Sequence, residues 1–90
     1  MNEKYISPET AIVVLDRGFV YVGNVSIDGD WCLIERANNI RVWGTTEGLG
    51  ELVNGPTKDT QLDVVGNVRA PMRAVISIIE VKADKWTGRL

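Results

Sequence analysis

The chain of 90 residues contains no histidine and a single cysteine, Cys32. The absence of histidine removes the most common general base, the usual nucleophilic triads and the most common metal ligand. One cysteine forms no disulfide within the chain, and without histidine it cannot complete a structural zinc site. We therefore expect a protein that is not an enzyme and that holds no metal and no cofactor.

Long apolar runs and a concentration of positive charge are also missing. The longest apolar candidate, at 74–81, is broken by Ser77 and Glu80, whereas a bilayer span needs about 18 residues. The first ten residues lack the charged-then-apolar order of a signal peptide. The net charge is −2, and the ten basic residues are scattered from Lys4 to Arg89, which disfavours a long nucleic acid as partner. These features predict a cytoplasmic protein without a membrane or long nucleic-acid partner.

Hydrophobic residues make up 44% of the chain and charged residues 24%, which is typical of a globular domain. A domain this small buries only about 60% of its unfolded surface, and pairing with further copies buries more. We therefore expect a homo-oligomer of one domain. Its predicted organisation is an N-terminal arm at 1–9, a compact β-rich unit at 10–83 and a C-terminal tail at 84–90.

Segments rich in β-branched and aromatic residues predict five or six strands, at 11–17, 19–27, 31–37, 39–44, 60–66 and 72–82. The Asp-Gly pair at 28–29 predicts a tight hairpin, and Gly23 predicts a bulge or bend in the strand before it. Asn38-Asn39 predicts a corner, and the segment from Gly66 to Pro71 a loop. The last strand is the most apolar, which predicts a place in the middle of the core.

Alternation of side chains assigns faces within the predicted hairpin. It places Val22 and Asn24 on one face of the first strand. In the strand that follows, it places Cys32, Ile34 and Arg36 together. The apolar surroundings of Cys32 predict a buried, unreactive thiol.

Leu49, Leu52 and Val53 recur at helical spacing, with Thr45 or Thr46 available as an N-cap and residues 54–56 as a stop. The predicted fold class is therefore mostly β: a small five- to six-stranded antiparallel sheet or barrel with one short inserted helix.

One polar segment carries groups suited to ligand binding. Trp43 offers a flat face for stacking and Arg41 a planar fork for phosphate or carboxylate. With the neighbouring amides and hydroxyls they suit a nucleotide-like ligand, and the candidate ligand-binding residues are Asn38, Asn39, Arg41, Trp43, Thr45 and Thr46. The alternative is that these residues serve the fold, with Trp43 in the core, Arg41 paired with Glu35 or Glu47, and the others forming a turn and a cap.

The order of these motifs resembles a family of small phage and prophage proteins. The resemblance covers roughly residues 11–82, through the GFVYVGNVSIDGD hairpin, the RANNIRVWG segment, GLGELVNGP and the closing AVISIIEV. The family pattern R-x-x-W-x-W-x-G has two aromatic residues where this chain has Trp43 alone. More faintly, residues 20–34 are similar to the strand-turn-strand of Sm-like barrels, although the predicted helix comes late and the acidity suits RNA poorly.

The resemblance implies a phage origin. Small phage proteins without catalytic equipment often act on host defence, and one class oligomerises and sequesters nucleotide-derived signals of bacterial immunity. The leading hypothesis is a non-enzymatic oligomer that binds such a small nucleotide-like ligand. The alternative is an interaction or structural module that uses an exposed β edge.

Overall fold

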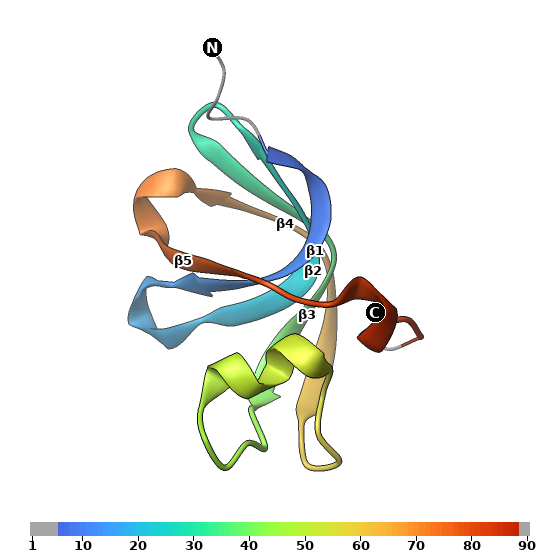
Figure 1. Cartoon of the computed structure of the whole chain (residues 1–90). Helices are drawn as coiled ribbons and strands as arrows, with labels where there is room; N and C mark the ends of the chain where they lie inside the picture. The colour runs from blue at the N-terminus through green and yellow to red at the C-terminus, as the bar shows by residue number, and fades with distance from the viewer. Residues whose placement is uncertain (1–5, 89–90) are drawn as a thin grey trace.

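The protein is mostly β in the computed structural model, which describes residues 6–88, with side chains from residue 9 onward. Five antiparallel strands form one sheet in the order β4-β3-β2-β1-β5 (Figure 1). Their bounds are β1 (Ile6–Leu15), β2 (Val20–Asp28), β3 (Trp31–Val42), β4 (Gln61–Pro71) and β5 (Val75–Glu80). The predicted small antiparallel sheet is confirmed. It is open, because within the described residues β4 and β5 are its two edges and do not pair with each other.

Short 3-10 helices lie between the strands at η1 (Asp16–Gly18), η2 (Leu49–Asn54) and η3 (Met72–Ala74), and η4 (Ala83–Lys85) follows β5. The inserted helix predicted from Leu49 and Leu52 is η2. Its cap differs from the prediction, because Gly48 occupies the N-cap position with a φ of 106° and no side chain caps the helix. The predicted stop is confirmed, since Gly55 follows the helix and its N–H donates to the Leu52 carbonyl. None of the described helices has the length and apolar character needed to span a membrane.

The hairpin of β2 and β3 forms where the Asp-Gly pair predicts it. Asp28 pairs with Trp31, and Gly29 between them has a φ of 59°. The irregularity predicted at Gly23 is also present, because the register with β3 shifts between Val22 and Asn24. A Cβ at position 23 would lie 2.8 Å from the Glu35 carbonyl oxygen, so the close approach of β3 requires glycine there.

Two predicted interruptions are absent from the sheet. β3 runs without a corner through Asn38 and Asn39, because the amide of Asn39 donates to the Val20 carbonyl at 3.3 Å and thereby supports the strand. The segment from Gly66 to Pro71 is part of β4 rather than a loop, since Gly66 and the residues from Val68 to Pro71 pair with β3. Pro71 is accommodated as the last residue of an edge strand.

The most apolar strand does not lie in the middle of the core, contrary to prediction. β5 is an edge strand that pairs only with β1 among the described strands. Its apolar sequence has another cause, because the sheet packs on both faces. Ile78 packs against one core and Ile79 against the other, while Ile76 is 67% exposed.

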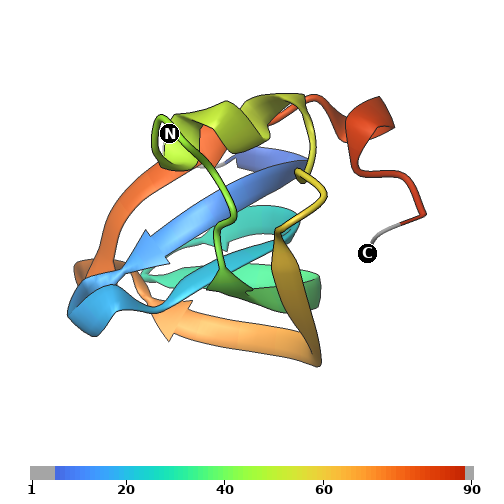
Figure 2. The ribbon, with the colours of Figure 1, turned by 90° about the horizontal axis from the view of Figure 1, so that it is seen from below.

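Two hydrophobic cores lie on opposite faces of the sheet. The first core is built around Ala11, Val13, Leu15, Val25, Cys32, Ile34, Ala37 and Ala70. The second core contains Ile12, Val20, Val22, Ile40, Leu52 and Trp86. Figure 2 shows η2 lying across the sheet on the side of the second core.

The ends of the described chain belong to this packing. β1 begins at Ile6, so residues 6–9 extend the sheet, while residues 1–5 of the predicted arm lie outside the described residues. Trp86 is 1% exposed, and its Nε1–H donates to the Leu52 carbonyl at 3.0 Å. It therefore anchors the segment after β5 to the second core. Residues 89–90 of the predicted tail lie outside the described residues.

Candidate functional site

The six residues singled out by sequence are divided between the two faces of β3 and the loop after it. Asn38 is buried and, by alternation along the strand, shares the face of Ile40 and the second core. Asn39 and Arg41 lie on the opposite face. Thr46 donates to the Glu51 carboxylate at 3.2 Å in the loop that leads into η2.

Arg41 and Trp43 have separate surroundings. The Arg41 Nε–H donates to the Asp63 carboxylate at 2.9 Å in an exposed ion pair, so its partner is on β4 rather than Glu35 or Glu47. The Trp43 side chain is 41% exposed, and its carbonyl accepts a hydrogen bond of 2.7 Å from the Thr60 hydroxyl. The six residues do not converge in one cavity, and ligand binding by them stays a prediction.

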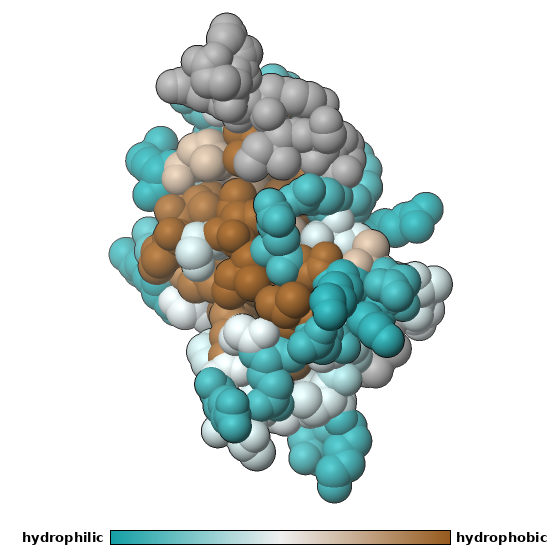
Figure 3. Space-filling view, in the orientation of Figure 1, coloured by the Kyte–Doolittle hydropathy of each residue, from teal (hydrophilic) through white to brown (hydrophobic). Residues whose placement is uncertain are grey.

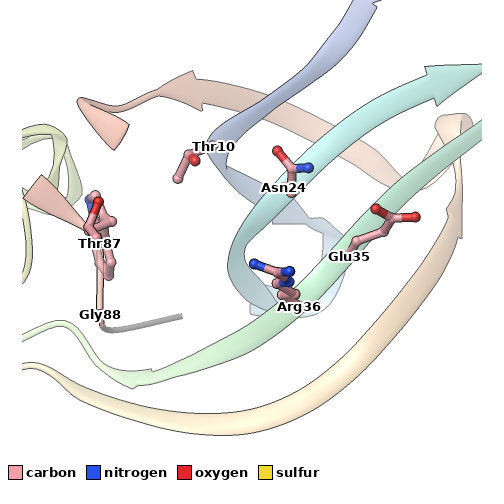
Figure 4. Close-up of a pocket in the computed structure, with 7 residues that line it drawn as sticks. Thr10, Asn24, Glu35, Arg36, Thr87 and Gly88 are labelled. Atoms are coloured by element: carbon pink, nitrogen blue, oxygen red, sulfur yellow. The ribbon is translucent and has the colours of Figure 1, made fainter. Parts of the chain in front are cut away.

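A different set of polar residues does converge. Thr10 pairs with Asn24 across β1 and β2, and Asn24 pairs with Glu35 across β2 and β3. These three residues stand side by side on neighbouring strands and form one wall of a hollow of about 430 Å³. The hollow, called the polar hollow below, is lined by Thr10, Asn24, Glu35, Arg36, Trp86, Thr87 and Gly88 (Figure 4).

The second core explains why the hollow lies where it does. Ile12 and Val22 belong to that core, and Thr10 and Asn24 are the next residues on the same face of each strand. Polar side chains thus replace apolar ones just where the core ends. The chain after η4 forms the opposite wall because Trp86 fixes it to the core.

Arg36 reaches the polar hollow through an irregularity in β3. Its φ is 55°, a left-handed conformation that costs a residue with a Cβ about 1–2 kcal/mol. The register of β3 shifts here against both neighbouring strands, and the Arg36 N–H donates to the Asn67 side-chain oxygen at 3.3 Å. Arg36 therefore does not follow Cys32 and Ile34 into the first core, as simple alternation predicts, but lines the hollow with an exposed side chain.

The hollow holds one basic and one acidic side chain, those of Arg36 and Glu35. Within residues 9–88 the ion pair present is that of Arg41 with Asp63, so neither Glu35 nor Arg36 has an ionic partner in this range. A guanidinium holds phosphate or carboxylate through two parallel hydrogen bonds. The Glu35 carboxylate accepts hydrogen bonds from hydroxyl or amine groups, and the neutral side chains of Thr10 and Asn24 offer donors and acceptors.

Metal and thiol chemistry have little support in the described residues. They contain no group of three or more histidine, cysteine, aspartate or glutamate side chains that could hold a metal ion. Cys32 is fully buried in the first core, and burial raises the pKa of its thiol above the ordinary value of 9.0. The predicted unreactive thiol agrees with this environment.

Comparison of the chain with protein-family models, curated proteins and solved structures finds no match.

Proposed function

We propose that the protein binds a small nucleotide-like ligand in the polar hollow without converting it, and that Arg36 holds the ligand's anionic group. The observation that carries the proposal is the Arg36 guanidinium, which has no ionic partner within residues 9–88 and lies beside hydrogen-bonding side chains that stand in register on three strands. The volume of about 430 Å³ falls in the range of about 300–1,000 Å³ typical of small-molecule sites.

The backbone of Arg36 adds support. A left-handed arginine inside a strand persists only where the surrounding structure fixes it, and such residues are enriched at functional sites. Arg17 also has a positive φ, but it lies beside Gly18 in the tight turn between β1 and β2, where that conformation is ordinary. Arg36 thus combines backbone strain with a charged side chain that lines a hollow.

Binding without turnover agrees with the composition of the chain. The chain has no histidine, and its single cysteine is buried. The resemblance to small phage proteins adds a biological role to the proposal, in which the protein sequesters a nucleotide-derived signal of bacterial immunity.

The first experiment is a thermal-shift screen with cyclic dinucleotides, cyclic ADP-ribose isomers and plain nucleotides. Each mixture is then analysed by mass spectrometry. A ligand present at about 100 times its Kd stabilises the folded state by about 2.7 kcal/mol, and we expect it to be recovered intact. A converted ligand would instead indicate an enzyme, and no shift with any ligand would contradict the proposal.

Two arginines of β3 provide a matched pair for locating the site. Both are exposed, but Arg36 lines the polar hollow whereas Arg41 is paired with Asp63 elsewhere. We expect Arg36→Ala to abolish the ligand-induced shift and Arg41→Ala to preserve it. The opposite result would move the site to Arg41 and Trp43.

A second candidate function, an interaction module, is favoured by apolar side chains on both sheet edges. Val64 on β4 is 87% exposed and Ile76 on β5 is 67% exposed, and Figure 3 shows apolar residues gathered over β5. Unprotected edges of this kind promote pairing with another strand. If the edges mediate association, Val64→Lys or Ile76→Lys should lower the mass measured by sedimentation, whereas an unchanged monomer would remove the support for this function.

A further inference from the structure

We infer that the polar hollow recognises the sugar-phosphate part of a nucleotide and leaves the base outside. This inference rests on the proposed function and specifies which part of the ligand the protein contacts. It predicts that ligands sharing a ribose phosphate bind with similar affinity whatever base they carry.

The described residues that line the hollow present no aromatic face for a base. The aromatic residue among them, Trp86, is 1% exposed, with its Nε1–H already bonded to the Leu52 carbonyl. The exposed tryptophans lie elsewhere. Trp31 has the Arg69 guanidinium over its ring at 5.4 Å, and Trp43 follows the far end of β3. Base recognition without a stacking platform would lack its usual source of affinity.

The hollow instead offers groups that suit hydroxyls and a phosphate. A carboxylate that accepts hydrogen bonds from ribose hydroxyls is a recurring means of holding that sugar in nucleotide sites. Glu35 supplies such a carboxylate, and Asn24 stands directly beside it on β2. Residues in register on neighbouring strands have Cβ atoms about 4.5–5.5 Å apart, so both can reach one sugar ring.

The phosphate is assigned to Arg36, the next residue along the chain from Glu35. Figure 4 shows these two side chains on β3, with Asn24 and Thr10 on the neighbouring strands and Thr87 across the hollow. An acidic and a basic side chain in one hollow, each without an ionic partner in the described chain, match a ligand with hydroxyl donors at one end and an anion at the other.

Isothermal titration calorimetry with a small ligand series tests the inference. The series contains the four ribonucleoside monophosphates, ribose 5-phosphate, 2-deoxyribose 5-phosphate and inorganic phosphate. We expect the nucleotides to bind within about threefold of one another and of ribose 5-phosphate, and the deoxy sugar to bind about tenfold more weakly, since it lacks a hydroxyl for Glu35.

Glu35→Ala is the variant that tests the hydroxyl contact, because it removes the acceptor oxygens. Glu35 is exposed, so the variant should keep the melting temperature of the parent chain, while the preference for ribose over deoxyribose should fall to less than about threefold. A preference that persists in this variant would overturn the assignment of Glu35.

The outcomes separate the inference from the proposed function. Strong selection of one base, or nucleotide binding without binding of ribose 5-phosphate, overturns the inference and leaves the proposed function standing. Inorganic phosphate that binds as tightly as ribose 5-phosphate overturns the sugar contact. Absence of binding by every nucleotide, including the cyclic ones, overturns both.

Discussion

Replacing Arg36 by glycine should remove ligand binding while preserving or raising stability. The left-handed backbone of Arg36 costs about 1–2 kcal/mol, which glycine does not incur. Glycine inside a strand loses about 0.5–1 kcal/mol through its greater freedom in the unfolded chain. The Arg36 side chain is exposed, and its N–H bond to Asn67 does not depend on the side chain. Subtracting the entropic loss of glycine from the relieved backbone strain predicts a gain of about 0.5–1 kcal/mol in the free energy of unfolding.

Urea unfolding followed by tryptophan fluorescence measures the stability, and calorimetry with the best ligand of the screen measures binding. For a domain of this size, a gain of about 1 kcal/mol raises the melting temperature by about 4–8 °C. Arg36→Ala is the control, because it removes the guanidinium but retains a Cβ in the strained conformation. Both variants should lose binding, and only the glycine variant should gain stability.

Two results would refute this reasoning. A glycine variant less stable than the parent by about 1 kcal/mol or more would mean that the Arg36 side chain supports the fold. A variant that still bound the ligand with the parental affinity would mean that the polar hollow is not the site.

Three further predictions concern the scaffold. Gly44→Ala should lower the free energy of unfolding by about 2–4 kcal/mol, because Gly44 has a φ of 68° and a Cβ there would lie 2.7 Å from the Asp59 carbonyl oxygen. Gly18→Ala is the control, since Gly18 has a φ of 83° but a Cβ there would meet nothing within 4 Å. It should lower the free energy of unfolding by only about 1 kcal/mol in the same urea assay. Trp86→Phe should lower the free energy of unfolding by about 1–3 kcal/mol, since it leaves a smaller ring at a fully buried position and removes one of the two hydrogen bonds that the Leu52 carbonyl accepts; the other, from the Gly55 N–H, remains. An unchanged free energy of unfolding would contradict this packing role of Trp86. Burial raises the pKa of Cys32, so at high pH the folded chain retains a proton that the unfolded chain releases. The free energy of unfolding should therefore fall as the pH rises above 9.0, and Cys32→Ala should remove that part of the pH dependence.

Much of the sheet follows from local signals in the sequence. The Asp-Gly turn sets the pairing of Asp28 with Trp31, and this register continued along the hairpin places Asn24 opposite Glu35. The position of the hairpin turn therefore predicts that Asn24 and Glu35, part of one wall of the polar hollow, lie side by side. Neither Asn24 nor Glu35 indicates a site when considered alone, because polar residues are common on strands.

The remainder depends on contacts that local patterns do not carry. Simple alternation fails at Arg36 because the register between β2 and β3 shifts there. Gly23 predicts an irregularity on β2, but it does not predict which residue of β3 adopts the irregular conformation. The apolar sequence of β5 predicts a strand in the middle of the core, but β5 is an edge strand. An edge strand that packs against a core on each face has the same apolar sequence pattern as a central strand. Trp86 enters the second core through long-range packing against Leu52.

The two cores also determine how the molecule opens. In the centre of β1, Ala11, Ile12 and Val13 are fully buried, with a strand on either side and a core on either face. Their amide protons should exchange with solvent only when the whole domain unfolds, so their exchange rates report its global stability, whereas those of edge strand β4 report local opening. Because Ala11 pairs with Glu80, the sheet is completed only after most of the domain has been brought together, a topology associated with slow folding.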